Sequence, residues 1–437
     1  MTEWPEQRFA SLLSEPLRNG LYKPKEFHGR GAKVINMGEL FAYPRMRSVP
    51  MKRIDVDPKE AAKFAIRGGD LIFARRSLVA EGAGKCTVVL DVDELTVFES
   101  SIIRARPTPE RAHSLFYYYF FNSPSGMHKL DTIRRQVAVA GITGGDLAEL
   151  ALPVPTLPEQ RAIAATLGAL DDKIELNRKM NATLEAMARA LFRDWFVDFG
   201  PTRAKMEGRP PYLSPDLWSL FPDRLDDEGK PEGWAFEPLL DQAEWVNGAA
   251  YKNMHFSDAP DALPVIKIAE LKNGVTGNTQ WTATDLGARY LIDDGELLFS
   301  WSGNPDTSID TFLWTGGKAW LNQHIFAVRP NGKRFKPYLH TLLKHLKPEF
   351  AELARNKQTT GLGHVTKADM QRMMVCAASP EVHKAFDRLI EPIFSQALGL
   401  QTESRTLAQT RDLLLPRLMS GELRVGDLAS FDQEAVA

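Results

Sequence analysis

The chain of 437 residues carries one succession of short sequences twice, and this internal repeat limits what the chain can fold into. Five pairs of segments match in the same order, at offsets between 222 and 231 residues: 34–40 with 265–271, 69–73 with 295–299, 102–107 with 325–330, 158–159 with 380–381, and 183–184 with 406–407. Each match is short, but five in one order indicate a tandem duplication. The period is far longer than the roughly 20–50 residues of a solenoid repeat, so two related domains are predicted.

Within each half the pattern is mixed and rich in strands. Asp70–Ala74 and Thr87–Asp91 have the length and apolar, partly β-branched content of strands, and Gly or charged residues bound them. Arg111–Phe121 and Phe335–Leu346 are predicted as short helices.

Each half is followed by a segment with the spacing of a long helix. Pro158–Phe199 opens with proline, and 42 residues would form a rod of roughly 63 Å. The second segment runs from about Pro380 to Met419. We expect Gly200–Pro201 to end the first helix and Pro416 to kink or stop the second. The positions that form an apolar seam at 3-4 spacing, and that we expect to pair the helices or dock subunits, are Ile163, Leu167, Leu170, Ile174, Asn177, Leu184, Leu191 and Trp195, then Phe386, Ile390, Ile393, Leu400, Leu407 and Leu414.

Two matching seams in one chain predict that the helices pair as an antiparallel coiled coil. Asn177, Asn181 and Ser404 lie on these seams, either as register-setting polar groups or as tolerated surface positions. The predicted fold class is α+β, with two tandem, mixed, strand-rich domains and a long helix after each, related by a pseudo-two-fold repeat. The predicted boundaries are 1–155 for the first domain, 156–199 for its helix, 200–231 for a linker, 232–379 for the second domain, 380–420 for its helix, and 421–437 for a tail.

Composition excludes several classes of protein. A net charge of −2 argues against a protein that coats nucleic acid, so any DNA contact must come from local patches. The two cysteines, Cys86 and Cys376, cannot form a disulfide framework or a four-cysteine zinc site. The N-terminus has no secretory pattern, and the longest strongly apolar run, 115–121, is far short of a membrane span. We expect a cytoplasmic protein.

Several motifs resemble those of type I restriction–modification specificity subunits. The segment LPEQRAI at 157–163 resembles the start of that family's central helix, and LFRDWFVDF at 191–199 resembles its end. RAKMEG at 203–208 is similar to the connection between the repeats, and LLLPRL at 413–418 resembles the end of the C-terminal helix. The resemblance covers nearly the whole chain. The second copy departs from it at 380–382, where the glutamine that usually follows the glutamate is absent.

This resemblance implies a function in defence against phage DNA. Each globular half would be a target-recognition domain that reads one part of a split, double-stranded DNA sequence, and the helices would set the spacing. The helices would also dock two methyltransferase subunits that carry S-adenosylmethionine, and motor-nuclease subunits using ATP and Mg²⁺ would complete the complex. The chain itself would be non-catalytic, with no cofactor, no metal and no membrane partner of its own.

Motifs that would indicate an enzyme are incomplete. Gly82–Thr87 lacks the first glycine of a phosphate-binding loop and has cysteine where that loop needs serine or threonine. Asp223, Glu228 and Lys230 mimic a metal-dependent nuclease but lie in a Pro/Gly-bounded linker. Asn304–Asp306 is a partial echo of an amino-methyltransferase loop. Turns and a solvated acidic loop explain all three.

DNA reading requires Arg or Lys for guanine, Asn or Gln for adenine, and Lys, Arg or Ser for phosphates. Three segments of each half fit this chemistry and recur at equivalent places of the repeat. The candidates are Tyr22, Lys23, Lys25, Arg30, Arg75, Arg76, Ser77, Lys85, Arg134, Arg135 and Gln136 in the first half, and Tyr251, Lys252, Asn253, Trp301, Ser302, Asn304, Arg355, Lys357 and Gln358 in the second. Gln323–His324, just before the strand at Ile325, is compatible with a structural role.

Three other functions stay open from the sequence. The chain could be a coiled-coil scaffold, or a regulatory paralogue without DNA specificity of its own, because the seam alone would suit either. A self-contained nuclease rests only on Asp223, Glu228 and Lys230.

Overall fold

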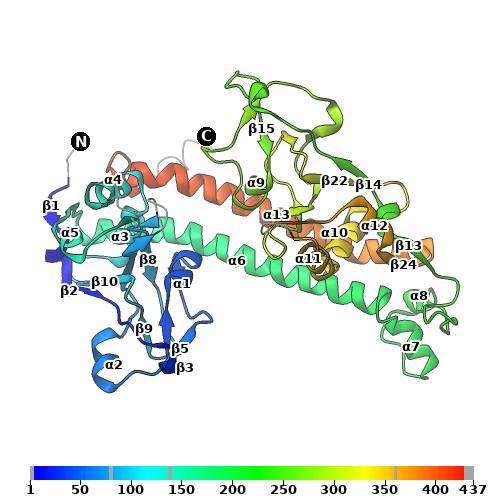
Figure 1. Cartoon of the computed structure of the whole chain (residues 1–437), viewed down its shortest axis with the longest axis horizontal. Coiled ribbons are helices and arrows are strands. Elements are labelled where there is room, and N and C mark those ends of the chain that lie inside the picture. Colours follow the sequence, from blue (N-terminus) through cyan, green and yellow to red (C-terminus); the bar gives the residue numbers. More distant parts are fainter. Residues whose placement is uncertain (1–3, 78–81, 136–139, 359–361, 428–437) are drawn as a thin grey trace. The chain divides into compact units, whose positions relative to one another are not determined.

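The computed structural model describes residues 4–77, 82–135, 140–358 and 362–427 (Figure 1). The chain divides into two compact units. Unit 1 comprises Met1–Ile174 with Thr406–Ala437, and unit 2 comprises Glu175–Arg405. Each unit therefore contains one globular half and parts of both long helices. The predicted mixed α+β class, with strand-rich sheets and long helices, is confirmed.

A five-stranded sheet and a three-stranded sheet form the globular part of unit 1. The larger sheet has the order β2 (Leu13–Asn19), β10 (Ile102–Pro107), β6 (Leu71–Ala74), β8 (Cys86–Val89) and β4 (Arg45–Met46). The smaller has the order β5 (Lys52–Ile54), β3 (His28–Ile35) and β9 (Thr96–Phe98), and two ribbons pair β1 (Glu6–Arg8) with β12 (Ala151–Pro153) and β7 (Arg76–Ser77) with β11 (Ala140–Gly141). The helices are α1 (Met37–Ala42), α2 (Pro58–Phe64), α3 (Ser114–Phe121), α4 (Pro124–Ile133) and α5 (Gly144–Glu149).

The apolar run of the sequence forms α3, and this helix supplies much of the core of unit 1. Phe121 meets Phe73 of β6 edge to face at 5.0 Å, and Phe9 lies 5.3 Å from Phe121. The run is therefore a core helix rather than a span. None of the helices in the described ranges combines the length and the apolar character that a membrane span requires.

Unit 2 repeats this arrangement with two four-stranded sheets. One has the order β14 (Glu244–Asn247), β22 (Ile325–Arg329), β18 (Leu297–Ser300) and β20 (Asp310–Leu313), and the other β16 (Trp281–Thr282), β15 (Leu263–Ile266), β21 (Ala319–Leu321) and β17 (Leu291–Ile292). Two ribbons pair β13 (Ala235–Pro238) with β24 (Met374–Ala377) and β19 (Ser302–Gly303) with β23 (Gly363–His364). The helices of the globular part are α9 (Ile268–Asn273), α10 (Lys336–His345), α11 (Lys347–Asn356) and α12 (Lys367–Arg372).

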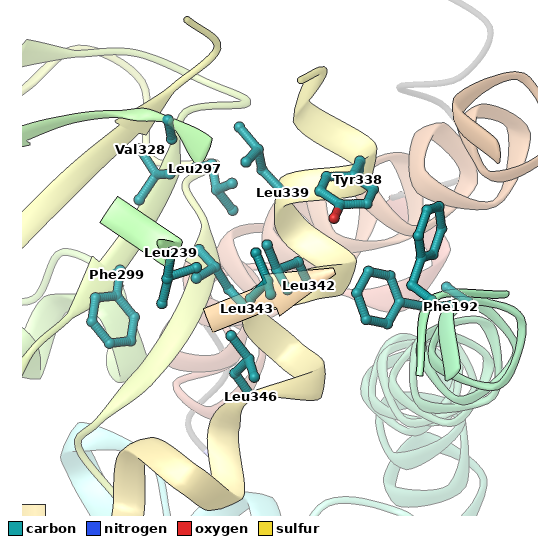
Figure 2. Packing of buried hydrophobic residues seen from close by; sticks show 14 of the residues in the cluster. Phe192, Leu239, Leu297, Phe299, Val328, Tyr338, Leu339, Leu342, Leu343 and Leu346 are labelled. Carbon is teal, nitrogen blue, oxygen red and sulfur yellow. The ribbon is translucent and has the colours of Figure 1, made fainter. Parts of the chain in front are cut away.

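Figure 2 shows how α10 fills the core of unit 2. Leu339, Leu342 and Leu343 of α10 are buried in one cluster with Leu297 of β18. Tyr338, on the same helix, lies 5.6 Å from the ring of Phe192 on the long helix α6. The core of the second globular half therefore continues onto that helix.

The duplication extends to individual hydrogen bonds. At the start of α1, the Asn36 amide donates to Glu39 Oε2 at 2.9 Å, and at the start of α9 the Lys267 amide donates to Glu270 Oε2 at 3.0 Å. In both, the backbone N–H of the N-cap residue donates to the side chain of the glutamate three residues later. This bond is one of the two that make a capping box, and it satisfies a free donor at the helix N-terminus.

Two helices of 40 residues each follow the globular halves: α6 (Leu157–Phe196) and α13 (Pro380–Met419). Gly200–Pro201 does not end α6, which stops at Phe196. Phe199 takes a left-handed conformation (φ 55°) that turns the chain, and Gly200–Pro201 begin α7 (Gly200–Met206). Burial of Phe199 against Trp234, at 6.0 Å, compensates the unfavourable backbone.

Proline does not stop α13 either. The helix continues through Pro392, whose surroundings include the buried Ile390 and Phe394, and through Pro416 to Met419. Pro416 lies in the last turn, so little helix remains to be disrupted, and Gly421 (φ 70°) follows the end.

The predicted seam positions are largely inward. Those buried are Ile163, Leu167, Ile174, Asn177, Trp195, Phe386 and Ile390, and those partly buried are Leu170, Leu184, Leu191, Ile393, Leu400, Leu407 and Leu414. Within unit 1, Ile163 and Leu167 share a core with Leu418. Within unit 2, Phe192 and Phe196 pack on Phe386 at 6.0 and 5.0 Å.

The segment 200–231 is folded rather than extended. It contains α7 and α8 (Pro215–Trp218), and Phe221 is buried 4.9 Å from the ring of Trp195. The Pro/Gly-rich composition therefore marks tight turns here.

Candidate nucleic-acid interface

In both globular halves, equivalent backbone hydrogen bonds hold the segment that follows a central strand of the sheet, β6 in unit 1 and β18 in unit 2. In unit 1 the Arg75 amide donates to a carbonyl just before β10 (2.8 Å), and the Arg75 carbonyl accepts from Ile142 (3.0 Å). In unit 2 the Trp301 amide donates to the His324 carbonyl (3.3 Å), and the Trp301 carbonyl accepts from Val365 (2.8 Å). Arg75 and Trp301 are therefore structural counterparts, and the two copies carry different chemistry at one place.

In each half, a glycine brings a second chain segment close to the segment that begins at Arg75 or Trp301, which we call the edge of that unit. A Cβ on Gly20 would stand 2.1 Å from the Glu99 carbonyl oxygen, and one on Gly248 would stand 2.2 Å from that of Asn322. Both glycine amides donate to the first residue of the facing strand, at 3.0 Å each. Only glycine permits this approach, which places the chain after residues 20 and 248 beside each edge.

Two predicted arginines meet at the edge of unit 1. Arg76 lies opposite Gly141 in the β7–β11 ribbon, and Arg135 forms an isolated bridge with the same glycine. Arg135 pairs with Asp146 at 2.8 Å, and Arg75 is partly buried. Arg76 is exposed, and within the described ranges its guanidinium has neither a carboxylate nor a hydrogen-bond partner. This side chain is available to an external anion or base.

Other predicted residues of this edge have internal partners. Lys85 donates to Asn122 Oδ1 at 3.2 Å, and Arg134 donates to a loop carbonyl at 3.1 Å with only 13% of its side chain exposed. Ser77 lies in β7 and is partly buried. Gln136 lies outside the described residues. Lys85 and Arg134 therefore stabilise the surrounding loops through internal hydrogen bonds.

The basic segment around residues 22–30 is exposed. Tyr22 is 78% exposed, and Lys25 is exposed as well. Lys23 pairs with Glu60 at 2.7 Å, and Arg30 pairs with an aspartate at 3.1 Å while 79% of its side chain stays exposed. Tyr22, Lys25 and Arg30 remain accessible.

The segment 301–304 at the edge of unit 2 carries neutral polar and aromatic groups. Trp301 donates from Nε1 to Asn247 Oδ1 at 3.0 Å, and its ring lies 5.5 Å from that of His324. Ser302 pairs across the β19–β23 ribbon and is partly buried. The side-chain oxygen of the exposed Asn304 accepts hydrogen bonds from the backbone amides of Asp306 and Thr307 in its own turn. Hydrogen bonds thus fix the ring of Trp301 in place.

Two predicted cations of unit 2 are paired with carboxylates. Arg355 lies 3.1 Å from Asp306, and Lys357 donates to Asp369 at 2.6 Å. Burial opposes ionisation of Asp369, but the hydrogen bonds from Lys357 and Thr366 outweigh it and lower the pKa of Asp369 to about 2. The Lys357–Asp369 pair is the counterpart of the Arg135–Asp146 pair in unit 1.

The segment at 251–253 divides between core and surface. Tyr251 is buried, 6.4 Å from the ring of Trp320, and burial raises the pKa of its hydroxyl. Lys252, Asn253 and the more distant Gln358 are exposed. The structure thus presents Lys252 and Asn253 to solvent.

Lys367 and Gln323 were not among the predicted contacts, yet both lie at the edge of unit 2. Gln323 is exposed next to His324, and the exposed Lys367 places Nζ 5.6 Å over the ring of Phe326, which is 6.0 Å from Trp301. The repeat pointed to Gln323, because it aligns with the loop before β10. Nothing in the local sequence pointed to Lys367.

The nuclease-like residues do not form a site. Lys230 pairs with Glu228 and donates to Asp226 at 2.6 Å inside one turn, but Asp223 pairs with Lys205 instead, at 2.9 Å. Within the described ranges, no three His, Cys, Asp or Glu side chains gather as a metal site would require.

Comparison with known proteins identifies the family. A sequence profile of the type I restriction modification DNA specificity domain matches residues 30–186 and 231–375. The chain belongs to this family of type I restriction–modification specificity subunits. The predicted resemblance is confirmed, and both edges described above, from residue 75 and from residue 251 onward, lie inside the two matched regions.

Relatives of this specificity subunit extend over nearly its full length. It is 37% identical over 430 residues to the putative type I restriction enzyme MjaX specificity subunit of Methanocaldococcus jannaschii, covering 97% of this chain and 94% of the relative. It is 25% identical over 409 residues to the HindI specificity subunit of Haemophilus influenzae, covering 83% and 88%. A crystal structure of the S subunit from M. genitalium shares the fold, with a TM-score of 0.52 and 16% identity, over 95% of this chain and 96% of that one.

Proposed function

We propose that this specificity subunit reads a split double-stranded DNA target, with one half-site for each globular domain. One observation carries the proposal: an identical backbone frame presents Arg75 and Arg76 in one domain, and Trp301 and Ser302 in the other. A duplicated scaffold with exchanged side chains is what two readers of different sequences require. Family membership supports DNA as the ligand.

The side chains of the two edges suit different bases. An exposed guanidinium such as Arg76 matches the two acceptors of guanine in the major groove. The edge of unit 2, with its amides, hydroxyl and tryptophan, suits adenine and the methyl group of thymine. Exposed cations such as Lys25, Arg30 and Lys252 would bind phosphates, which position the protein without selecting a sequence.

We further propose that α6 and α13 pair antiparallel as a coiled coil that sets the distance between the half-sites. Contacts inside each unit support this. In unit 2, Asn177 Nδ2 donates to Glu403 Oε2 at 2.8 Å, and in unit 1 Arg411 lies 2.7 Å from Asp171. Asn177 is buried, so its hydrogen bond would fix the register of the pair.

The same helices would dock two methyltransferase subunits. Leu176, Met187 and Leu413 are 51%, 50% and 65% exposed on the helices, and exposed apolar side chains of this size commonly mark protein contacts. In this proposal S-adenosylmethionine, ATP and Mg²⁺ bind to the methyltransferase and motor-nuclease partners. The chain would catalyse nothing itself and would act in the cytoplasm.

The test is to co-express the chain with its neighbouring methyltransferase subunit in a methylation-free host and to map methylated bases by long-read sequencing. One split motif is expected. A stable complex without new methylation would instead favour a regulatory paralogue, and the absence of any complex would favour a coiled-coil scaffold without DNA specificity of its own.

Arg76→Ala separates base reading from phosphate binding. If Arg76 reads guanine, the variant should lose about 1–3 kcal/mol of discrimination at one position of one half-site. The other half-site should stay unchanged in the methylation map. Equal weakening on all sequences would assign Arg76 to a phosphate.

A further inference from the structure

We propose that Gln323 reads an adenine in the half-site of the second domain, from a platform made by Trp301 and His324, while Lys367 holds a neighbouring phosphate. This inference rests on the proposed function and names the side chains that determine specificity in unit 2. It assigns a role to two residues that were not among the predicted DNA contacts: Gln323, for which the sequence was compatible with a structural role, and Lys367.

The platform is rigid. The Gln323 amide donates to the Ala249 carbonyl at 2.9 Å, so the loop is tied to the strand that Gly248 brings close. The ring of His324 lies 5.5 Å from that of Trp301, and Asn247 holds the indole nitrogen at 3.0 Å. A base-reading group needs this kind of support, because a loose side chain loses entropy on binding and discriminates poorly.

The side-chain amide of Gln323 is free to pair. It is exposed, and within the described ranges its side chain makes a single hydrogen bond, a long 3.4 Å contact with His324 Nε2. An amide offers a donor and an acceptor side by side, which matches the N6 and N7 atoms of adenine. A phosphate offers acceptors only, so the paired donor and acceptor of the amide match the edge of a base better.

A cation lies near the Trp301 side of this platform. Lys367 Nζ lies 5.6 Å over the ring of Phe326, which in turn is 6.0 Å from Trp301. Lys367 is exposed, and across the described part of the chain it has no carboxylate within ion-pair distance. Arg355 and Lys357 are neutralised by aspartates, so Lys367 has an uncompensated charge near the platform. A phosphate next to the base that Gln323 reads would balance it.

The counterpart edge in unit 1 is built differently. Ser100 and Ser101 occupy the place of Gln323 and His324, because Arg75 donates to the Ser101 carbonyl as Trp301 donates to that of His324. There, Arg76 in the reading segment itself is exposed and has no carboxylate partner among the described residues. In unit 1 the cation lies in the segment after the central strand, whereas in unit 2 that segment is neutral and the neutral reader Gln323 lies in the facing loop. This difference is consistent with different half-sites.

The experiment uses the complex of the full chain with its methyltransferase subunit. Methylation motifs are mapped for the wild type and for Gln323→Ala, Gln323→Glu, Lys367→Ala and the control Gln371→Ala, an exposed glutamine on α12. Gln323→Ala should relax one position of the second half-site, by roughly 5- to 150-fold in preference, and leave the first half-site intact. Gln323→Glu should move the preference at that position towards cytosine, whose amino group a carboxylate accepts.

Lys367→Ala should weaken binding of all sequences alike and reduce the dependence of log affinity on log salt by about one. Gln371→Ala should change neither property. Co-purification with the methyltransferase confirms that each variant is folded. Unchanged motifs in both Gln323 variants overturn the inference while the split motif of the wild type still supports the proposed function. Absence of any motif in the wild type refutes the proposed function first.

Discussion

Gly248→Ala tests whether close approach of two chain segments builds the edge of unit 2. A methyl group at this position would stand 2.2 Å from the carbonyl oxygen of Asn322 and 2.5 Å from that of Leu321. Both obstacles are backbone atoms, so no side chain can rotate away. Real contacts of this type are rarely closer than 3.0 Å, so the segments must separate by roughly 1 Å.

That separation determines the energetic cost. The hydrogen bond from Gly248 to the Ile325 carbonyl (3.0 Å) and that from Ala249 to the Leu321 carbonyl (2.9 Å) would both exceed hydrogen-bond length. Each bond contributes about 0.5–1.5 kcal/mol, and a buried group left unpaired costs about 1–3 kcal/mol. We therefore expect Gly248→Ala to lower the free energy of unfolding by about 2–4 kcal/mol.

The assay is urea unfolding followed by tryptophan fluorescence. Eight of the nine tryptophans lie in unit 2 and only Trp4 lies in unit 1, so the signal reports chiefly on unit 2. The matched control is Gly399→Ala on α13, where a Cβ meets nothing within 4 Å and alanine should stabilise the helix by up to about 1 kcal/mol. The two substitutions should thus have opposite signs. A Gly248→Ala protein as stable as wild type would refute the reasoning.

Two further substitutions probe the core of unit 2. Burial raises the pKa of Asp387 to about 6, against a hydrogen bond from the Tyr338 amide that favours the charged form. Because the pKa of Asp387 is higher in the folded than in the unfolded chain, the stability of the wild type should fall as pH rises from about 4 to 6. Asp387→Asn should remove that loss. The Tm of the variant relative to the wild type should therefore be higher at pH 8 than at pH 4. Trp195 is fully buried and 4.9 Å from the ring of Phe221, so Trp195→Ala should cost about 3–5 kcal/mol in the same urea assay, whereas Trp281→Ala, at a side chain 39% exposed, should cost far less.

Local pattern predicted the helices well but not all of their ends. The 3-4 spacing identified α6 and α13, because burial of one helix face leaves a periodic mark on the sequence. The ends depended on packing instead. Phe199 turns the chain because Trp234 buries its ring, and α13 passes Pro392 because buried neighbours hold the helix on both sides. No local rule contains those contacts.

The sequence by itself determined that the chain is duplicated, that each half is strand-rich and that a long amphipathic helix follows each half. These properties are encoded in order and periodicity, which survive without three-dimensional information. The tertiary structure alone decided which polar residues are available. Lys85 and Arg134 hold loops in place and Asp369 neutralises Lys357, whereas Arg76 has no partner in the described part of the chain. Strand pairing brings residues far apart in sequence together, so a side chain's partners, and hence its freedom to bind DNA, are set only when the chain has folded.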